Sequence, residues 1–420
     1  MLIYLVSGLL LMALGVPVAI TIGLIPIAYI LINEIPINII VQQIISGINV
    51  TALLAIPLFI LAGDIMGKGG LAKRMIRFAS SLVGKVNGGL GIVTIIACMF
   101  FAAISGSGVA TAAALGSLMI PSMIEKGYDR GLASSIVATA SPLGVIIPPS
   151  ISFIIYSNLT NASVSDLYRA GLPAGLIIGA GLIILYYFLI KKQNIKEESI
   201  SFDLKEFWKS FKESIWALGT PIILVGGVFG GIFTPTESAA VAVVYALFVG
   251  VVIYREMGLK EILGVFLGSA KMTANIMFII ANASLLAWML ITEGLPQQIA
   301  NTLLLLSENP IVILLIVNLI ILIIGLFMET SATLVILVPL FLPIMTNLGI
   351  DSVHFGIIAT INTAIGLVTP PFGVCLFTTA SVGKVSISIL TKRVMLPVIV
   401  LFALLLFITF FPQSVMFLVD

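Results

Sequence analysis

Residues 105–150 of the chain read SGSGVATAAALGSLMIPSMIEKGYDRGLASSIVATASPLGVIIPPS, and residues 329–373 read ETSATLVILVPLFLPIMTNLGIDSVHFGIIATINTAIGLVTPPFG. When the second stretch is laid over the first at an offset of 222 positions, identical residues coincide at Pro121 and Pro343, Gly127 and Gly349, Asp129 and Asp351, Gly144 and Gly366, and Pro148-Pro149 and Pro370-Pro371. Glycine and proline decide where a helix breaks. Two membrane segments broken at corresponding places are typical of the binding site of a secondary transporter.

The composition of the chain places it in a membrane. Of its 420 residues, 60% are apolar and 9% are charged, and the mean hydropathy is +1.25, which excludes a soluble globular protein. Since a membrane-spanning helix needs about 20 apolar residues, roughly ten crossings fit in this length. A net charge of +2 gives no reason to expect a nucleic-acid partner. Cys98 and Cys375 lie in apolar runs, and we expect buried free thiols.

The basic residues orient the chain in the membrane. The predicted loops near 32–50, 157–168, 231–237, 292–309 and 346–354 contain no lysine or arginine. Basic residues gather instead at Lys68, Lys73, Arg74, Arg77, Lys85, Lys126, Arg130, Lys191, Lys192, Lys196, Lys205, Lys209, Lys212, Arg255, Lys260, Lys271, Lys384, Lys392 and Arg393. The positive-inside rule puts this basic set in the cytoplasm and the uncharged loops outside.

Two apolar stretches must enter and leave the membrane on the same side. Residues 86–125 are long enough for two helices, yet basic and therefore cytoplasmic residues flank both ends. We predict a re-entrant hairpin that turns at Ser105-Gly106-Ser107-Gly108. Residues 310–346 predict a second hairpin from the outer side, which turns near Met328-Glu329-Thr330-Ser331. Exposed backbone at such tips is tolerated only where protein or a water-filled cavity satisfies it.

The other apolar stretches predict crossings in two related halves. Approximate helices lie at 2–31, 52–67, 131–158, 169–190, 214–232, 236–254, 270–291, 353–383 and 391–417. The first of them has neither the basic stretch nor the cleavage site of a signal peptide. Because one crossing, 214–232, separates four in each half, the second half is predicted to be inverted, with the amino end inside and the carboxyl end outside. The predicted fold is an all-α polytopic membrane protein with inverted repeats at 1–190 and 236–420, joined by a connector at 191–235.

The connector contains the most polar stretch, residues 191–216. Within it, Phe207, Trp208, Phe211, Ile215 and Trp216 recur at helical spacing. Between them lie Lys205, Glu206, Lys209, Lys212 and Glu213. This pattern predicts an amphipathic helix in the membrane interface. A scaffold brace, a subunit contact and a plain connector all remain open as its role.

Each Pro-Pro pair lies midway along a predicted crossing, in 131–158 or in 353–383. Proline removes a backbone donor and clashes with the preceding turn, so each crossing is expected to be two half-helices joined by unwound chain. The freed carbonyls and nearby hydroxyls can ligate a small hard cation such as Na⁺. The amino ends of half-helices carry partial positive charge and can face an anionic substrate. We therefore expect two pseudo-symmetric sites, each made from one hairpin tip and one break.

The candidate ligands follow from this pairing of tips and breaks. In the first half the Na⁺ ligands are predicted to be Ser105, Gly106, Ser107, Gly108, Ser141, Gly144 and Pro148. In the second half they are Glu329, Thr330, Ser331, Thr333, Gly366, Thr369, Pro370 and Gly373. The substrate is expected at Ser105, Ser107, Pro149, Ser150, Thr330 and Pro371. The alternative is that these residues only kink and pack helices, but the recurrence of both motifs at one offset favours the sites.

Four carboxylates lie in or near predicted crossings, where a charge is costly and usually functional. Asp64 and Glu293 lie close to the ends of crossings, so we expect them to be solvated at the interface. Glu237 follows a proline and opens a helix, which predicts a partner for the helix dipole. Glu329 lies at a hairpin tip and is the strongest candidate for cation coupling.

Motifs along the whole chain carry a resemblance to a known family. They are Ile56-Pro57-Leu58-Phe59, Ala62-Gly63, Gly69-Gly70-Leu71-Ala72, Ser105-Gly106-Ser107-Gly108, Pro121, Gly127-Tyr128, Pro148-Pro149-Ser150, Phe233-Thr234-Pro235-Thr236-Glu237 and Thr369-Pro370-Pro371-Phe372-Gly373. With this set the chain resembles the large membrane subunit of the TRAP (tripartite ATP-independent periplasmic) transporters, the DctM or SiaM type.

The resemblance implies an elevator-type transporter of the ion transporter superfamily, in which hairpins and broken helices slide against a scaffold. It implies coupling to at least two Na⁺ ions, a small four-helix membrane subunit (DctQ or SiaQ type) and a periplasmic binding protein that delivers a carboxylate such as a C4-dicarboxylate or sialic acid. It also implies a multi-pass protein of the bacterial inner membrane, in contact with its lipid. No extension precedes Met1, so the small subunit is expected as a separate chain.

Other classes fit the sequence less well. A membrane-embedded protease would need His-Glu-x-x-His or a mid-membrane aspartate pair, but the only histidine, His354, lies in a predicted outer loop, and Asp64 stands alone. No Walker motif supports direct ATP coupling. A Na⁺-dicarboxylate carrier without a binding protein would share the architecture and is the nearer alternative. A passive channel is disfavoured, because paired hairpins suit alternating access better than a continuous pore.

Overall fold

The protein is built from helices. The computed structural model describes residues 2–82, 89–192, 204–307 and 309–419, and these ranges contain no strand, so the predicted all-α fold is confirmed. The helices are α1 (Leu2–Ala13), α2 (Val18–Ile32), α3 (Asn38–Ile48), η1 (Thr51–Leu54), α4 (Ala55–Lys68), α5 (Leu71–Leu82), α6 (Gly89–Ser105), α7 (Gly108–Glu125), α8 (Arg130–Ala140), α9 (Leu143–Ile146), α10 (Ile151–Thr160), α11 (Val164–Lys192), α12 (Leu204–Pro221), η2 (Ile222–Gly226), α13 (Gly227–Phe229), α14 (Pro235–Phe248), η3 (Val249–Ile253), α15 (Leu259–Thr292), α16 (Leu295–Leu306), α17 (Pro310–Gly325), α18 (Thr330–Asn347), α19 (Ser352–Gly366), α20 (Val374–Gly383), α21 (Ile387–Phe410) and α22 (Gln413–Met416).

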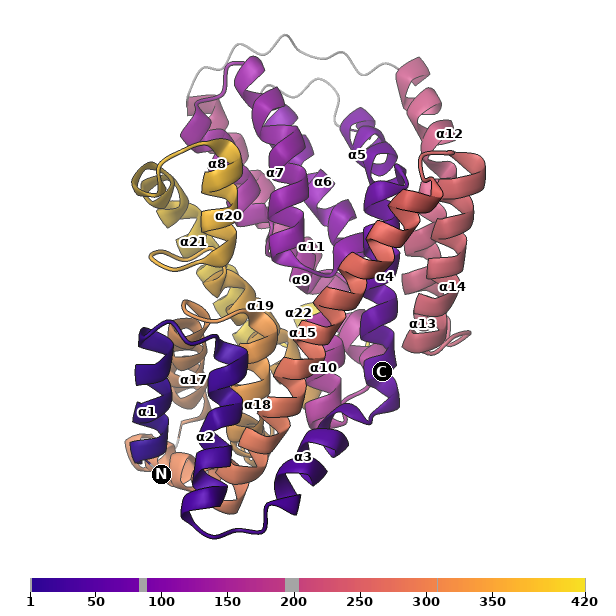
Figure 1. Cartoon of the computed structure of the whole chain (residues 1–420). Helices are drawn as coiled ribbons and strands as arrows, with labels where there is room; N and C mark the ends of the chain where they lie inside the picture. Colours follow the sequence, from indigo (N-terminus) through magenta and orange to yellow (C-terminus); the bar gives the residue numbers. More distant parts are fainter. Residues whose placement is uncertain (1, 83–88, 193–203, 308, 420) are drawn as a thin grey trace.

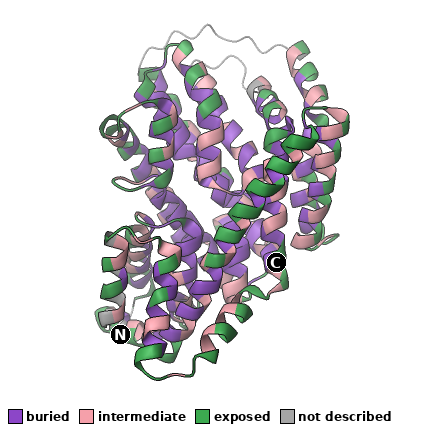
Figure 2. Ribbon diagram, in the orientation of Figure 1, coloured by how far each residue is buried: buried purple, intermediate pink, exposed green. Residues whose placement is uncertain are grey.

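The described chain contains seven helices long and apolar enough to cross a membrane, and eight if the bent pair over residues 130–160 is one crossing. This pair is bent by 42° at the break between its two parts. Figure 2 shows buried residues in the interior and exposed ones along the outward faces, where large apolar side chains such as Leu263 and Ile399 are more than half exposed. A surface of this kind requires lipid around it. The protein is therefore a multi-pass membrane protein.

Two helix pairs form the framework around which the others pack. α6 and α7 lie in the upper half of Figure 1, α17 and α18 lie in the lower half, and each pair is joined by a short turn. α7 packs against α8 and α20, while α18 packs against α19 and α10. Each pair therefore contacts the first half of one broken helix and the second half of the other, which ties the two pairs into one body.

A second group of helices surrounds this body on one side. α15 runs diagonally across the molecule and packs on α2, α3 and α4, and α4 packs on α14 (Figure 1). Asp64 of α4 accepts a hydrogen bond of 2.6 Å from Ser269 of α15, and Glu293 accepts one from the Tyr29 hydroxyl. Both carboxylates are half-buried, and each accepts a hydrogen bond from a hydroxyl of another helix, so their predicted solvation at the interface stays a prediction.

The predicted first crossing over residues 2–31 is wrong, because the segment forms two short helices. α1 and α2 pack against each other and are joined by residues 14–17. Gly15 has φ +87°, which ends α1, and Pro17 precedes α2. The inside position predicted for the amino end therefore no longer follows from a count of crossings.

Two helices replace stretches that were predicted as loops, and a third lies where no helix was predicted. α3 and α16 lie in the loops near 32–50 and 292–309, and α5 lies in the basic stretch after α4. These loops were assigned from the absence of lysine and arginine, which indicates the side of the membrane and does not indicate whether a segment is helical. The predicted crossing 214–232 is the second part of a run that starts with α12 at Leu204, so the amphipathic helix is not separate from it. Residues 193–203 of the predicted amphipathic segment and residues 86–88 of the first hairpin lie outside the described ranges.

Ion pairs fasten α5 to the helices beside it. Arg77 contacts Glu206 and Glu213 of α12, each at 2.7 Å. The hydrogen bond from Arg77 to Glu206 raises the pKa of the arginine, so its charge is permanent. Arg74 contacts Glu256 at 2.6 Å, and its guanidinium lies 3.7 Å from the centre of the Tyr254 ring. α12 therefore braces α5, the helix that leads into α6.

We expect Gly250→Leu to destabilise the protein. A Cβ at this position would lie 3.2 Å from the Cα of Gly69, so a larger side chain must force α4 and η3 apart. Such overpacking costs about 1–3 kcal/mol. The measurement is the midpoint of thermal unfolding in detergent. Gly268→Leu is the matched control, because a Cβ there meets nothing within 4 Å. An equal midpoint for both variants would contradict the close approach of α4 and η3.

Candidate functional site

The turn between α6 and α7 is built by its own hydroxyls. Gly106 has φ +58°, a left-handed conformation that lets the chain reverse directly after α6. Ser107 caps α7, because its Oγ accepts a hydrogen bond from the backbone N–H of Ala110. Thr111 donates to the Ser107 carbonyl at 2.8 Å, and its Oγ1 lies 3.0 Å from the Oγ of Ser105. Four polar groups therefore gather at the first tip.

The first break lies directly against this tip. A Cβ added to Gly144 would lie 2.4 Å from Thr111 Oγ1 and 2.6 Å from the Ser107 carbonyl oxygen. A Cβ on Gly106 would lie 3.1 Å from the carbonyl oxygen of Pro149. Glycine at both positions is what lets the two backbones approach so closely. The structure thus brings together the predicted residues of the first tip and the first break.

The tip between α17 and α18 repeats this local geometry. Glu329 caps α18, since its carboxylate accepts from the Ser331 N–H at 2.8 Å and from the Ser331 hydroxyl at 3.2 Å. Thr333 donates to the Glu329 carbonyl at 3.0 Å. Ser107 and Thr111 make the corresponding cap and hydrogen bond at the first tip, 222 positions earlier. The Glu329 side chain is exposed.

The second break lies against the second hairpin in the same manner. A Cβ on Gly366 would lie 2.5 Å from the carbonyl oxygen of Gly325, at the end of α17. The rings of Phe327 and Phe372 are 4.8 Å apart, so the tip and the unwound chain also meet through side chains. Residues 367–373 connect α19 to α20, and the Cys375 N–H donates to the Leu367 carbonyl at 2.9 Å. Both Pro-Pro bonds, at 148–149 and 370–371, are cis.

The two tip-and-break pairs are neighbours. A Cβ on Gly108, at the first tip, would lie 3.2 Å from Leu367, 3.3 Å from the Ser141 carbonyl oxygen and 3.4 Å from the sulfur of Cys375. The amino ends of α7, α10, α18 and α20 all start at these tips and breaks. Four helix ends with partial positive charge and many oxygen atoms therefore gather in one region, which suits an anion beside small cations.

The hydroxyls at the breaks have kept their acceptor capacity. Ser141 donates to the Ala138 carbonyl at 2.7 Å, and Thr369 donates to the Ile365 carbonyl at 2.7 Å. Ser150 donates to the Val145 carbonyl. A hydroxyl that gives its proton to a carbonyl still offers lone pairs to a cation. Thr111 and Gly325 were not among the predicted residues, although each lies against a glycine of a break. The offset could have found Thr111, because Thr333 is its counterpart.

The predicted substrate residues differ in access. Pro149, Ser150 and Thr330 are buried, whereas Pro371 is exposed, and Ser105 and Ser107 are half-buried. The buried hydroxyl of Thr330 has no hydrogen-bond partner among the described residues. In this conformation, then, only part of the predicted substrate set is accessible at the surface of the protein. The first break is closed off by protein, and the second is partly open.

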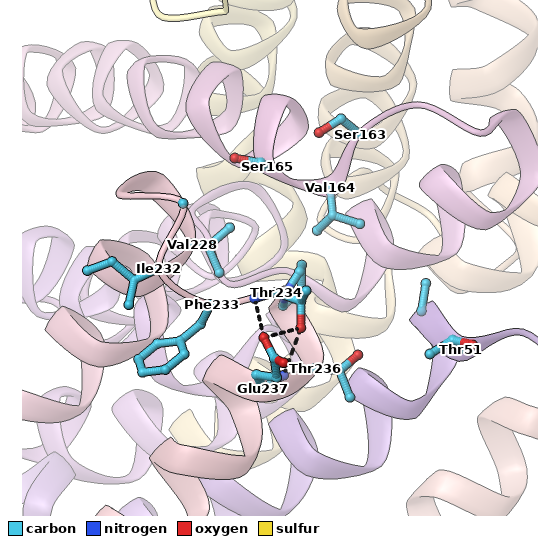
Figure 3. A pocket seen from close by; sticks show the side chains of 13 residues that line it. Thr51, Ser163, Val164, Ser165, Val228, Ile232, Phe233, Thr234, Thr236 and Glu237 are labelled. Carbon is cyan, nitrogen blue, oxygen red and sulfur yellow. Dashed lines mark hydrogen bonds between the residues drawn. The ribbon is translucent and has the colours of Figure 1, made fainter.

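A pocket away from the tips and breaks lies beside the start of α14. It has a volume of about 530 Å³ and is lined by Thr51, by Ser163 to Ser165 and by residues of the stretch 228–237 (Figure 3). Glu237 in this pocket accepts hydrogen bonds from the N–H and the hydroxyl of Thr234, at 2.8 and 2.9 Å, which completes a capping box. The prediction that Glu237 serves the amino end of a helix is confirmed. None of the predicted Na⁺ or substrate residues lines this pocket.

Two further predictions concern residues outside the tips. Cys98 and Cys375 are buried and free, as expected. The placement of His354 in an outer loop is wrong, because the residue lies in the first turn of α19, is buried, and its Nε2 is 3.0 Å from the Ile408 carbonyl oxygen. Among the described residues, no group of three or more His, Cys, Asp and Glu side chains is placed to hold a metal. Side chains of these four types are the usual ligands of transition metals. Na⁺ sites built from carbonyl and hydroxyl oxygens are a different kind of site, to which this finding does not apply.

Solved structures share the fold. The chain aligns with the YdaH transporter of Alcanivorax borkumensis with a TM-score of 0.61 at 14% identity, over 88% of this chain and 86% of that one. It aligns with MtrF of Neisseria gonorrhoeae, described among antimetabolite efflux pumps, with a TM-score of 0.58 at 17% identity, over 88% and 83%. At these identities the likeness concerns the architecture, which is that of membrane transporters.

Relatives are more similar in sequence. The chain is 41% identical over 407 residues to the isethionate TRAP transporter permease protein DctMQ of Oleidesulfovibrio alaskensis, and the match covers 97% of this chain and 64% of that protein. It is 41% identical to the C4-dicarboxylate TRAP transporter large permease protein DctM of Vibrio cholerae, over 96% of this chain and 93% of that protein. The sialic acid TRAP transporter large permease protein SiaM of the same organism is 37% identical, with 95% and 93% covered.

These relatives are transporter permeases, which excludes the enzyme alternative for this chain. The family model described as the DctM component of tripartite ATP-independent periplasmic transporters matches residues 5–414. The tips and breaks lie within the matched residues. The chain therefore belongs to the DctM component family of the tripartite ATP-independent periplasmic transporters.

Proposed function

We propose that the chain is the large permease of a Na⁺-driven TRAP transporter, which imports an organic anion across the bacterial inner membrane. The observation that carries this proposal is the contact between one hairpin tip and one helix break in each half, within a chain of this family. A periplasmic binding protein delivers the substrate, and a small four-helix membrane subunit extends the scaffold.

The two tip-and-break pairs each hold one Na⁺ ion in this proposal. The first ion is bound by oxygen atoms of the predicted set around Ser107 and Gly144, and the second by those around Gly366 and Thr369. Three features support this assignment: close backbone contact at both places, hydroxyls that still accept, and unwound chain that frees carbonyls. The Glu329 carboxylate at the second tip adds a negative charge near the second ion.

The hairpins and broken helices move together as an elevator in this proposal. Its support is the exchange of contacts in which α7 packs on α20 and α18 packs on α10, because this exchange joins both hairpins into one body. The group with α4, α14 and α15 then forms the scaffold against which the body slides. The two halves correspond to inverted repeats at 1–190 and 236–420, and the connector 191–235 lies between them.

The substrate is proposed to be a small organic anion with a carboxylate. Among the compounds in the relatives' names, C4-dicarboxylate, sialic acid and 2,3-diketo-L-gulonate are carboxylates, isethionate is a sulfonate, and all four are anionic. The amino ends of four helices near the tips supply the partial positive charge that such a substrate needs. A Na⁺-dicarboxylate carrier without a binding protein is not favoured, because the family match is to a component of a tripartite system.

Uptake by proteoliposomes tests the proposal directly. The chain is reconstituted with its small subunit under an inward Na⁺ gradient, and sialic acid and succinate are supplied with and without their binding proteins. We expect uptake that requires both Na⁺ and one binding protein, because the substrate must be delivered to a site coupled to the ions. Uptake with Na⁺ but without any binding protein would support the simpler carrier instead.

We expect Thr369→Ala to raise the Na⁺ concentration for half-maximal uptake. Loss of one oxygen ligand should weaken Na⁺ binding by about tenfold, which corresponds to about 1.4 kcal/mol. Thr378→Ala is the matched control, because Thr378 also donates to the carbonyl four residues earlier but lies on the exposed part of α20. If both variants kept the Na⁺ dependence of the parent, the hydroxyl of Thr369 would only shape the helix end.

Glu329→Gln should reduce Na⁺-driven uptake per reconstituted protein by about tenfold, since it removes a charge at the second tip and keeps the shape of the cap. Glu237→Gln provides the comparison, because both glutamates cap a helix and only Glu329 lies at a tip. The readout is the initial rate of uptake under a Na⁺ gradient. Equal rates for the two variants would mean that Glu329 serves as a cap and has no part in coupling.

A further inference from the structure

α12 has an inward face whose contacts hold the helix in one orientation. Ser210 donates to Ser81 of α5 at 2.7 Å, and Ser214 donates to the backbone carbonyl of Arg74 at 2.7 Å. The rings of Phe207 and Phe211 lie 5.9 and 5.7 Å from the ring of Phe78. These contacts come from residues 207–214 of α12, so over this stretch the opposite face of the helix points away from α5.

The acidic side chains of α12 are engaged by α5. Glu206 and Glu213 are the two carboxylates in this helix, and both pair with Arg77 of α5 at 2.7 Å. Arg77 therefore holds both carboxylates on the side of α12 that faces α5.

The outward face is basic at its start. Lys205, Lys209 and Lys212 line a surface pocket of about 480 Å³ together with Trp208, whose side chain is 52% exposed. Lys205 lies in the first turn of α12, where a lysine is unfavourable for the helix because the amino end already carries partial positive charge. Lys209 and Lys212 lie beyond that turn and line the same pocket.

Further along, the same face becomes apolar. Ile215 and Trp216 are about half exposed, and Ile222, just after α12, is 68% exposed. Figure 1 shows α12 at the edge of the molecule, with its amino end at the top. The face therefore passes from three lysines and a tryptophan to exposed hydrocarbon, which is the order of chemistry from the headgroups to the acyl chains of a lipid leaflet.

We propose that this face of α12 binds an anionic phospholipid of the cytoplasmic leaflet, with the phosphate held by Lys205, Lys209 and Lys212. Trp208 lies at the level of the headgroup, and Trp216 and Ile222 contact the acyl chains. Lipid occupancy then fixes α12 at the membrane surface, and α12 in turn braces α5. The inference rests on the proposed function and on the orientation in which the basic residues face the cytoplasm. It does not depend on which ion or substrate is carried.

The test measures lipid binding to the purified full chain in a neutral detergent, by native mass spectrometry with phosphatidylglycerol or phosphatidylcholine. We expect the parent to bind phosphatidylglycerol in preference to phosphatidylcholine. The triple variant Lys205→Gln, Lys209→Gln, Lys212→Gln should bind phosphatidylglycerol about tenfold more weakly, because each lysine near a phosphate contributes to the attraction. Binding by the parent should also weaken as salt is raised.

The control carries the same loss of charge at other exposed lysines. It is Lys260→Gln, Lys271→Gln, Lys392→Gln, and Lys260 occupies the second position of α15 as Lys205 does in α12. The control should bind phosphatidylglycerol as the parent does. A second arm with glycerol 3-phosphate should show little binding, because the soluble headgroup lacks the acyl chains that Trp216 and Ile222 contact.

Three results would overturn the proposal. One is equal binding of phosphatidylglycerol by the two triple variants, and another is equal binding of the two lipids by the parent. The third is a triple variant at 205, 209 and 212 that keeps its lipid but no longer copurifies with the small membrane subunit, since the face would then be a protein interface. Because the readout is lipid binding and not uptake, a failure here leaves the transport proposal standing, and a failed uptake experiment leaves this one standing.

Discussion

Unwound backbone in a membrane must be covered by protein, because lipid offers no hydrogen bonds to free N–H and C=O groups. In this chain the cover depends on glycine. Gly144 and Gly366 lie where a Cβ would come within about 2.5 Å of backbone or hydroxyl oxygen of the opposing hairpin. Any side chain at either position would separate the tip from the break. The polar atoms at both places would then face hydrocarbon.

The rest of the body follows from that constraint. Each hairpin covers one break, and its second arm also packs on the far half of the other broken helix. The caps repeat across the halves, with Ser107 and Glu329 at matching positions and Thr111 and Thr333 donating to them. They differ in charge, so any coupling through a carboxylate belongs to the second half alone.

The polar helix α12 lies at the edge of the molecule and contacts this body through α5 (Figure 1). Its inward serines and phenylalanines pack on α5, and Arg77 joins the two helices through both glutamates. Because α5 also packs on α6, a restraint on α12 also restrains α6. Relatives named for different anions match this chain over nearly its whole length.

The sequence by itself determined the membrane class, the two hairpins with their turns, and the positions of both breaks, because proline and glycine act locally and recur at one offset. It also indicated the family. It did not predict the break at 14–17. Gly15 and Pro17 could have indicated it, but they lie within a long apolar run that was interpreted as one crossing. Nor did it find α3, α5 and α16, since the charge of a segment carries no information on its helicity.

Only the tertiary structure decided which atoms meet. Gly144 contacts Thr111, and Asp64 pairs with Ser269, although these partners are far apart in the sequence. Ser150 and Thr330 are buried, which the sequence does not distinguish from exposure. The physical reason is that helix breaks are set by the torsion angles and donors of single residues. Access and contact are set by the packing of several helices at once, and no local pattern contains that information.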